Sequence, residues 1–365
     1  VSVTTATELI ELFSSAKGNT VDVNIDIQND LDFSQSNLIL PLGVHSSGAC
    51  VSYSGVMHGN GHAIKGIRMS NQDKYPAYNH AGLFCDLKDA VVKNLVIDSS
   101  CYFGGNHSGS LCVSLMVISV TNKASVKGHT SVGGFVGEAK DLTKGALVSF
   151  EKCTNEGEVT GDSFVGGFVG YVHNNTNNRM IISNSVNNGV FISADNGAGG
   201  LIGYVSWNSG MSLEISASMN NGIVVSASQV GGLVGHVGKD HTSGTAMIIH
   251  GCTNKGRITG DGSVGGFVGV IASNVTMDIS RCINGMITGG KNGYVGGFVG
   301  EIQVSTSVKI SASMNKEIVL GRGSYSAGLV GYASSDTPSE PVTLSVLNSE
   351  NEGSVSAGIG MACGF

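Results

Sequence analysis

The sequence is poor in charged residues, in proline and in long apolar runs. Charged side chains make up 13% of the 365 residues, and proline occurs 4 times. Lysine and arginine are scattered in ones and twos and the net charge is −7, so no basic stripe exists to neutralise nucleic-acid phosphates. No apolar run approaches the roughly 18 residues of a membrane-spanning helix. We therefore expect neither nucleic acid as a partner nor a membrane span in this segment.

Metal-binding and targeting patterns are also missing. The 8 cysteines form no CxxC pair and show no zinc spacing; they are Cys50, Cys85, Cys101, Cys112, Cys153, Cys252, Cys282 and Cys363. Several lie in apolar segments, where a buried thiol acts as a small hydrophobe, and their spacing assigns no disulfide. The chain begins at Val1 without a signal-peptide pattern, so we expect it to be processed or excised from something longer.

What the sequence does contain is glycine in a regular repeat. It has 55 glycines and 41% hydrophobic residues, enough to bury a large core. VGGFVG occurs at residues 132–137, 165–170, 264–269 and 295–300, with AGGLIG at 198–203 and VGGLVG at 230–235. The glycine before each Phe or Leu recurs about every thirty residues, at Gly134, Gly167, Gly200, Gly232, Gly266, Gly297 and Gly328, and less cleanly at Gly358, which precedes an isoleucine. With divergent copies near residues 82 and 110, this predicts about ten repeats.

A second anchor recurs in the same register. It reads CTNEGEVTG at residues 153–161, and its asparagine forms the column Asn122, Asn155, Asn187, Asn220, Asn254, Asn284, Asn315 and Asn351. Asparagine tolerates left-handed turn conformations, and stacked amides can hydrogen-bond from one repeat to the next. We therefore interpret the column as structural and favour this over a ligand-binding role.

Each repeat predicts strands and no helix. In the segment 213–218, Leu213 and Ile215 alternate with polar residues, a period of two, and three short strand candidates per repeat are separated by Gly and Asn turns. This pattern predicts a solenoid, in which each strand pairs with its counterpart in the next coil about 4.8 Å away. Ten coils would make a rod roughly 45–50 Å long. Like positions, such as Ile215, Ile249 and Ile279, should then stack in a dry interior.

The repeats resemble the GLUG motif of bacterial and protozoan surface and secreted proteins, over about residues 50–365. The opening GVMHGNGHAIKGIRM at 55–69 is similar to the first coils of such domains. The resemblance implies an all-β fold, a right-handed parallel β-helix, within adhesins, surface coats or non-catalytic parts of secreted proteases. Two departures weaken the register near the end: Glu317 stands where a glycine is expected, and the last copy reads AGIGMACGF.

The two ends of the chain are predicted to differ. Thr5 and Glu8 fit a capping box before an apolar helical pattern, which predicts a short helix over residues 6–16. We assign residues 1–50 to an N-terminal cap and 51–365 to the β-helix. No such cap is predicted at the other end, so we expect the chain to continue or to dock on another molecule.

Candidate catalytic acids are few. Glu214 and Asp278 share one outward column but lie two coils apart with Ile248 between them, whereas glycosidic cleavage needs two carboxylates about 5–9.5 Å apart. Asp278 and Lys309 are neighbours and predict a cross-strand ion pair. The interpretation is that the chain has no catalytic residue and is not an enzyme.

Histidines likewise suggest no metal or cofactor site. His58 and His62 flank a turn, where a hydrogen-bonded turn histidine is a better explanation than a metal ligand. Asp240 and His241 share one loop without a second carboxylate. We therefore expect no metal and no cofactor.

Three N-glycosylation sequons begin at Asn106, Asn174 and Asn274, which weakly favours a secreted or cell-surface protein. Our first hypothesis is a non-enzymatic extracellular scaffold, such as a coat, filament subunit or adhesin stalk, that self-associates or binds other surface proteins or glycans. The alternatives are a carbohydrate-active β-helix enzyme and a carbohydrate- or receptor-binding module built from the loops 138–146, 171–179, 204–211, 236–246 and 333–341. Grouped carboxylates would favour the enzyme, and a row of exposed aromatics would favour sugar binding.

Overall fold

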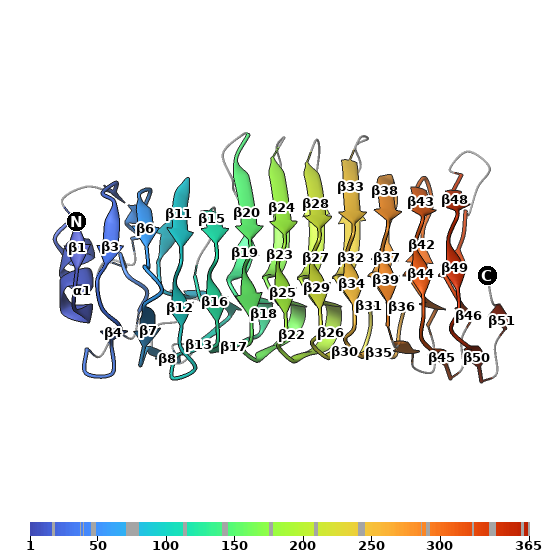
Figure 1. The fold of residues 1–365 in the computed structure, drawn as a ribbon, viewed down its shortest axis with the longest axis horizontal. Coiled ribbons are helices and arrows are strands. Elements are labelled where there is room, and N and C mark those ends of the chain that lie inside the picture. Colours follow the sequence, from blue (N-terminus) through green and yellow to red (C-terminus); the bar gives the residue numbers. More distant parts are fainter. Residues whose placement is uncertain are drawn as a thin grey trace.

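The protein is a rod of stacked parallel β-coils (Figure 1). The computed structural model describes residues 1–16, 19–36, 38, 40–44, 49–70, 80–111, 115–140, 145–174, 178–207, 211–239, 245–285, 287–289, 293–322, 325–335, 341–358 and 361–363. The prediction of an all-β parallel β-helix with a short N-terminal helix is confirmed. Like positions stack as predicted, because Ile215 pairs with Ile249 and Ile249 with Ile279, and all three are buried.

Sheet 1 carries the strands with strict alternation and runs the length of the rod. Its 12 strands are β1 (Ser2–Val3), β3 (Ile25–Ile27), β6 (Val56–His58), β11 (Ala90–Lys93), β15 (Leu115–Ile118), β20 (Leu147–Glu151), β24 (Arg179–Ser183), β28 (Ser212–Ser216), β33 (Thr245–His250), β38 (Val275–Ser280), β43 (Ser307–Ser311) and β48 (Thr343–Leu347).

Sheet 2 consists of very short strands that hold the asparagine column. Its 11 strands are β4 (Leu31–Asp32), β7 (Ala63–Lys65), β12 (Val96–Ile97), β16 (Thr121–Asn122), β21 (Thr154–Asn155), β25 (Val186–Asn187), β29 (Met219–Asn220), β34 (Thr253–Asn254), β39 (Ile283–Asn284), β44 (Met314–Asn315) and β49 (Glu350–Asn351).

Sheet 3 receives one long strand or two shorter strands from each coil. Its 18 strands are β8 (Arg68–Ser70), β9 (His80–Ala81), β13 (Tyr102–Gly105), β14 (His107–Ser108), β17 (Ser125–Gly128), β18 (Thr130–Gly133), β22 (Val159–Gly166), β26 (Phe191–Gly199), β30 (Val224–Ser226), β31 (Val230–Gly231), β35 (Ile258–Gly260), β36 (Val264–Gly265), β40 (Ile287–Gly289), β41 (Val295–Gly296), β45 (Val319–Gly321), β46 (Ser326–Ala327), β50 (Val355–Ala357) and β51 (Ala362–Cys363).

Sheet 4 begins inside the repeated glycine motif. Its 7 strands are β19 (Val136–Ala139), β23 (Val169–Asn174), β27 (Ile202–Trp207), β32 (Val234–Lys239), β37 (Val268–Ile271), β42 (Val299–Ile302) and β47 (Val330–Ala333). A small sheet of 3 strands, β10 (Asp86–Leu87), β5 (Ser52–Tyr53) and β2 (Thr20–Val21), takes part in the N-terminal coils.

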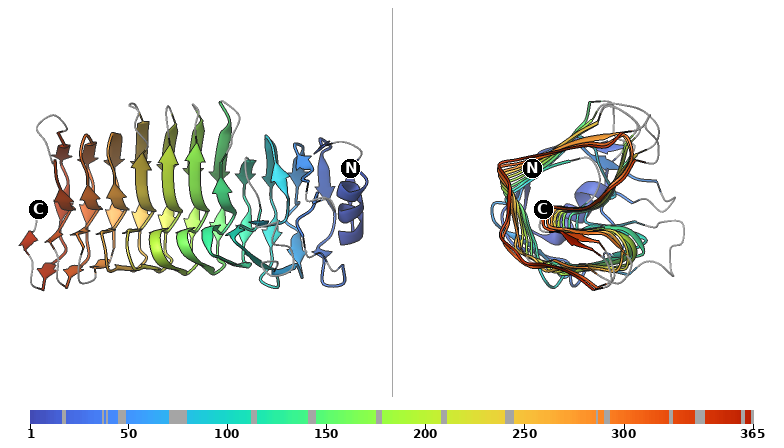
Figure 2. Two further views of the ribbon diagram at one scale, coloured as in Figure 1. Left: turned by 180° about the vertical axis from the view of Figure 1, so that it is seen from behind. Right: turned by 90° about the vertical axis from the view of Figure 1, so that its right-hand side faces the viewer.

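The 7 coils that supply a strand to sheet 4 therefore cross four sheets, whereas the sequence predicted three strands per coil. The end-on view in Figure 2 shows why: the outline of the coil folds inward on one side before the chain returns to sheet 1. The end of β22 and the start of β23 form this inward fold, and the glycines at its bend bring the two backbones into contact. A β-carbon on Gly170 would lie 2.5 Å from the carbonyl carbon of Ser131. Only glycine permits so close an approach.

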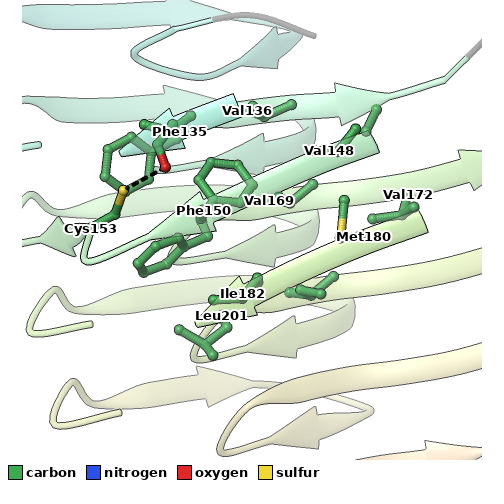
Figure 3. Close-up of a cluster of buried hydrophobic side chains, with 14 of the residues drawn as sticks. Phe135, Val136, Val148, Phe150, Cys153, Val169, Val172, Met180, Ile182 and Leu201 are labelled. Atoms are coloured by element: carbon green, nitrogen blue, oxygen red, sulfur yellow. Dashed lines mark hydrogen bonds between the residues drawn. The ribbon is translucent and has the colours of Figure 1, made fainter. Parts of the chain in front are cut away.

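The inward fold explains why both apolar residues of the motif are buried. Phe168, in the bend, and Val169, at the start of β23, are each 0% exposed, because the coil covers both faces of this segment. Phe135 packs against Phe150 from sheet 1, with ring centroids 5.7 Å apart (Figure 3). It also packs against Phe168, with ring centroids 5.0 Å apart. The core is thus one continuous column of side chains from neighbouring coils.

The corner between sheets 1 and 2 is held by a buried hydroxyl or thiol. Ser185 Oγ donates to the carbonyl of Ser183 at 2.8 Å and accepts the amide of Cys153 at 3.1 Å. Cys153, in the same column, donates its thiol to the carbonyl of Val117 at 3.4 Å. Burial raises the pKa of this thiol to about 12, so it stays protonated and can donate. The cysteines in this column are hydrogen-bonding substitutes for serine, beyond the apolar role expected from the sequence.

At that corner, the residue with left-handed backbone conformation lies three positions before the asparagine of the second anchor. Lys152, Asn184, Ala217 and Arg281 have φ between 45° and 54°, whereas the anchor asparagines are not among the positive-φ residues. The expectation that those asparagines adopt the left-handed turn conformation is therefore wrong. Their side chains point inward from sheet 2 instead.

The N-terminal end is closed by a helix, α1 (Ala6–Ser14), which lies across the first coil in Figure 1. The predicted capping box is confirmed: Thr5 accepts the amide of Glu8, and the Glu8 carboxylate accepts the amide of Thr5. The helix is two residues shorter than predicted. Its Leu9 and Phe13 are buried, and a disulfide joins Cys50 to Cys85 with Cα atoms 5.7 Å apart.

The last described coil is less well covered. Leu344 of β48 is 40% exposed, whereas Val308, its partner in the preceding coil, is 1% exposed. The strands of residues 1–50 already pair with later coils, since β3 pairs with β6. The division at residue 50 stays a prediction.

Candidate functional site

The eight predicted asparagines form one hydrogen-bonded ladder inside the rod. Each side-chain amide donates to the side-chain oxygen of the next: Asn122 to Asn155 at 2.8 Å, Asn155 to Asn187 at 3.0 Å, Asn187 to Asn220 at 2.7 Å, Asn220 to Asn254 at 2.9 Å, Asn254 to Asn284 at 3.0 Å, Asn284 to Asn315 at 2.8 Å and Asn315 to Asn351 at 2.7 Å. All but the last are 0% exposed, so a ligand outside the rod does not contact them.

The ladder explains the glycine that precedes each Phe or Leu of the motif. A β-carbon on Gly134 would lie 2.7 Å from the side-chain oxygen of Asn155, and one on Gly167 would lie 2.8 Å from that of Asn187. Both distances are shorter than real β-carbon contacts. The motif glycine and the anchor asparagine are therefore two halves of one packing arrangement.

The two histidines at residues 58 and 62 point to different partners. His58 Nε2 lies 3.2 Å from the side-chain nitrogen of Asn94, and His62 Nδ1 lies 3.5 Å from Asp30 Oδ1. In the described part of the chain, no three side chains of His, Cys, Asp or Glu converge as metal ligands would.

The predicted acids of sheet 1 are placed as the register required. Glu214 pairs with Ile248, and Ile248 with Asp278, so the two carboxylates are two coils apart. Asp278 forms the predicted ion pair with Lys309 at 3.5 Å. Glu214 instead binds Arg179 of the preceding coil at 3.0 Å.

Other predicted sites fall on residues outside the described ones. Asp240 and His241 are among them, and so is part of every loop proposed as a recognition surface: 138–146, 171–179, 204–211, 236–246 and 333–341. Of the sequons, Asn174 ends β23 and its side chain is not described. Asn106 is half-buried, whereas Asn274 is exposed and has a left-handed φ of 61°.

Aromatic side chains line the outer edges of the inward fold, a feature the sequence analysis missed. Phe164 packs against Tyr171 and Tyr204 with centroids 5.1 and 4.7 Å apart, and Tyr204 stacks on His236 at 4.3 Å. Burial lowers the pKa of His236 to about 4, which keeps the ring neutral at ordinary pH. Three tyrosines form a second cluster further along, where Tyr294 stacks on Tyr332 at 4.1 Å. Because these rings cover one another, the clusters join the two arms of the inward fold.

A separate hollow lies on the outer face of sheet 3, across several N-terminal coils. It has a volume of about 360 Å³ and is lined by Ser70, Tyr102, Gly104, Lys127, Gly128, His129 and Asp162. His129 Nδ1 lies 2.6 Å from Asp162 Oδ2 at one end. It is the described surface feature that best combines an aromatic ring, charged groups and concavity.

Glycine at position 104 creates this hollow. In the ladder of sheet 3, Gly104 pairs with Ser70 on one side and with Lys127 on the other, and Lys127 pairs with Thr160. The ring of Tyr102 fills part of the space that a side chain would occupy, since a β-carbon on Gly104 would lie 2.8 Å from its Cε1. The sequence signal was Gly104, which stands where the neighbouring coils have Ser70 and Lys127.

Comparisons with known proteins give little beyond the fold. No family model matches the chain, so membership of the GLUG family is not shown, and no curated protein matches either. A solved structure, "a putative immunoglobulin A1 protease from Bacteroides ovatus", is 17% identical over 98% of this chain and 77% of its own, with a TM-score of 0.41. At this identity and TM-score the similarity carries no argument about what this chain does.

One expectation needs correction. We predicted from the sequence that the chain is not an enzyme, whereas the similar structure is named as a protease. We withdraw the prediction and assign no activity in its place. The physical reason is that catalytic groups on a solenoid come together from separate coils. The lack of a local catalytic motif in the sequence is therefore weak evidence against activity. In the part of the chain that the structure describes, α1 is the one helix, and its 9 residues are too few to span a bilayer.

Proposed function

We propose that this chain is an extracellular β-solenoid scaffold of the GLUG-like type, which serves in a surface coat, a filament or an adhesin stalk. The single observation that carries the proposal is the asparagine ladder from Asn122 to Asn351, which links eight successive coils inside one continuous core. A rod whose coils are joined by side-chain as well as backbone hydrogen bonds resists bending. Such a rod can hold its two ends at a fixed distance from each other, as a coat, filament or stalk requires.

The extracellular setting is supported by the disulfide and by the surface. Disulfides persist in oxidising compartments, and Cys50–Cys85 fastens the N-terminal coils. The partners we propose are other surface proteins, glycans or further copies of this chain. The described surface ion pairs, such as Lys123 with Glu156 and Lys309 with Asp278, are dispersed along the rod, a pattern that suits polar contacts better than binding to a polyanion.

The test of this proposal is surface labelling of the native protein. An antibody raised against the purified chain should label intact cells of the source organism or their secreted material, and external protease should remove the label. Electron microscopy of the purified chain should show a rod, since the 12 strands of sheet 1 at about 4.8 Å spacing span about 53 Å. Labelling that appears only after cells are made permeable would contradict the proposal.

Glycosylation gives a separate prediction, because the structure distinguishes the sequons. Asn274 is exposed just before β38, and Thr276 of its sequon is exposed as well. Asn106 is half-buried and Ser108 of its sequon is 0% exposed. When the chain is secreted from eukaryotic cells, Asn274→Gln should abolish one glycan, seen as the loss of one mass shift on treatment with peptide N-glycosidase.

The matched control is Asn106→Gln, which should leave the glycan mass unchanged. A glycan found at Asn106 and absent from Asn274 would contradict this reading of the surface.

A further inference from the structure

The hollow on sheet 3 has the chemistry of a site for a sugar ring. Tyr102 is half-exposed on the outer face, with Phe103 buried beneath it. A tyrosine ring offers a flat apolar surface for the C–H face of a pyranose, and its hydroxyl offers a polar edge. The described tyrosines of the inward fold stack on other rings, as Tyr294 does on Tyr332. The ring of Tyr102 lies instead beside the backbone of Gly104.

Polar groups surround that ring on the sides where sugar hydroxyls would lie. Lys127 is exposed on the next coil, and Ser70 lies on the preceding coil. Beyond Lys127, the bond of 2.6 Å between His129 and Asp162 places a donor and an acceptor at the far end. Donors and acceptors around an aromatic surface, in a hollow of about 360 Å³, fit a small polyhydroxylated ligand.

The charges around the hollow are balanced, which favours a neutral ligand. Arg68 is the neighbour of Tyr102 in the ladder, and Lys127 lies one coil beyond, so two cations flank the ring. Asp162 lines one end of the hollow, and Glu158, which is exposed, lies on the same coil as Asp162. Within the lining itself, Lys127 and Asp162 carry opposite charges. A strongly anionic ligand gains little from such a surface, whereas sugar hydroxyls can use both signs.

We infer that this hollow binds a neutral sugar unit of a glycan, with Tyr102 as the stacking surface and Lys127, His129 and Asp162 as hydrogen-bonding groups. The inference deepens the proposed scaffold role by giving the rod a lateral glycan-binding site. It does not depend on where the protein is located, because binding is measured on the purified chain. Failure to bind sugar would leave the scaffold proposal standing.

The test is a binding experiment with immobilised oligosaccharides of glucose, galactose, mannose and N-acetylglucosamine, alongside oligosaccharides ending in glucuronate or sialic acid. At least one neutral oligosaccharide is expected to bind saturably. In saturation-transfer NMR, its ring protons should receive magnetisation from the protein. Tyr102→Ala should weaken the binding about tenfold or more, because the stacking surface is lost.

A second variant separates binding from folding. Gly104→Thr places a side chain where the aligned coils have Ser70, Lys127 and Thr160, so the rod should tolerate it, but the new side chain displaces the Tyr102 ring and fills the hollow. It should abolish binding with an unchanged circular dichroism spectrum. The control is Tyr325→Ala, which removes an exposed tyrosine elsewhere on the rod and should leave the affinity unchanged.

Three results would overturn the inference. They are a lack of saturable binding to every neutral oligosaccharide, binding confined to the acidic ones, and binding that survives both Tyr102→Ala and Gly104→Thr.

Discussion

Replacing Asn220 with alanine is expected to lower the free energy of unfolding by about 3 to 5 kcal/mol. The Asn220 side chain accepts from Asn187 at 2.7 Å and donates to Asn254 at 2.9 Å, and it also bonds both backbone groups of Gly222, at 3.1 and 3.2 Å. Alanine leaves these partners buried without a hydrogen bond, and each such group costs about 1 to 3 kcal/mol. Urea unfolding followed by circular dichroism measures the loss.

The adjacent residue supplies a matched control for this change. Asn221 is exposed, and its side chain bonds only the exposed Asn188 among the hydrogen bonds described, at 2.9 Å. Asn221→Ala should therefore change stability by less than about 0.5 kcal/mol. Hydrogen exchange should show the effect of Asn220→Ala concentrated in the neighbouring coils, because each coil contacts only its neighbours. Equal effects of the two variants would disprove a structural role for the ladder.

Gly200→Ala is expected to destabilise the rod by about 3 kcal/mol, although it adds a single carbon. The new β-carbon would lie 2.7 Å from the side-chain oxygen of Asn220 and still closer to the carbonyl oxygen of Gly232. Neither neighbour can move without breaking the ladder or the backbone bonds between coils. The thermal and urea midpoints of the purified variant measure this cost.

Another glycine tests whether the cost comes from contact or from glycine replacement in general. Gly251 has φ 62°, and a β-carbon there would meet nothing closer than 4.0 Å. Ala217, in the same column one coil earlier, already adopts φ 45°. Gly251→Ala should thus cost about 1 kcal/mol or less. If it costs as much as Gly200→Ala, the contact between motif glycine and asparagine is not the cause.

The coils could be predicted from the sequence because two independent columns recur in one register. The alternation around Ile215 and the spacing of the motif glycines each require stacked strands, and the structure has both. The inward fold could not be predicted, because Phe168 and Val169 give the same apolar pattern whether the strand is covered on one face or on both. The left-handed corner was misplaced by three positions, since Lys152, Ala217 and Arg281 are not residues that favour positive φ.

The candidate site was beyond the reach of sequence patterns for a different reason. Ser70, Tyr102, Lys127 and Asp162 come from separate coils and are brought together only by the register of sheet 3. Repeats in that region are divergent, so their alignment is not evident from the letters alone. Where the register was clear, the ion pair of Asp278 with Lys309 and the asparagine column could be placed in advance.

The asparagine ladder also gives the interior of the molecule a direction. Every amide nitrogen in it faces the coil that follows and every oxygen faces the coil that precedes, so the side-chain dipoles add instead of cancelling. Such a chain of like-oriented dipoles strengthens each of its members through mutual polarisation. The ladder therefore gives the rod a net dipole along its long axis. The side-chain amide of a coil inserted in the opposite direction would place its dipole against those of the two neighbouring coils.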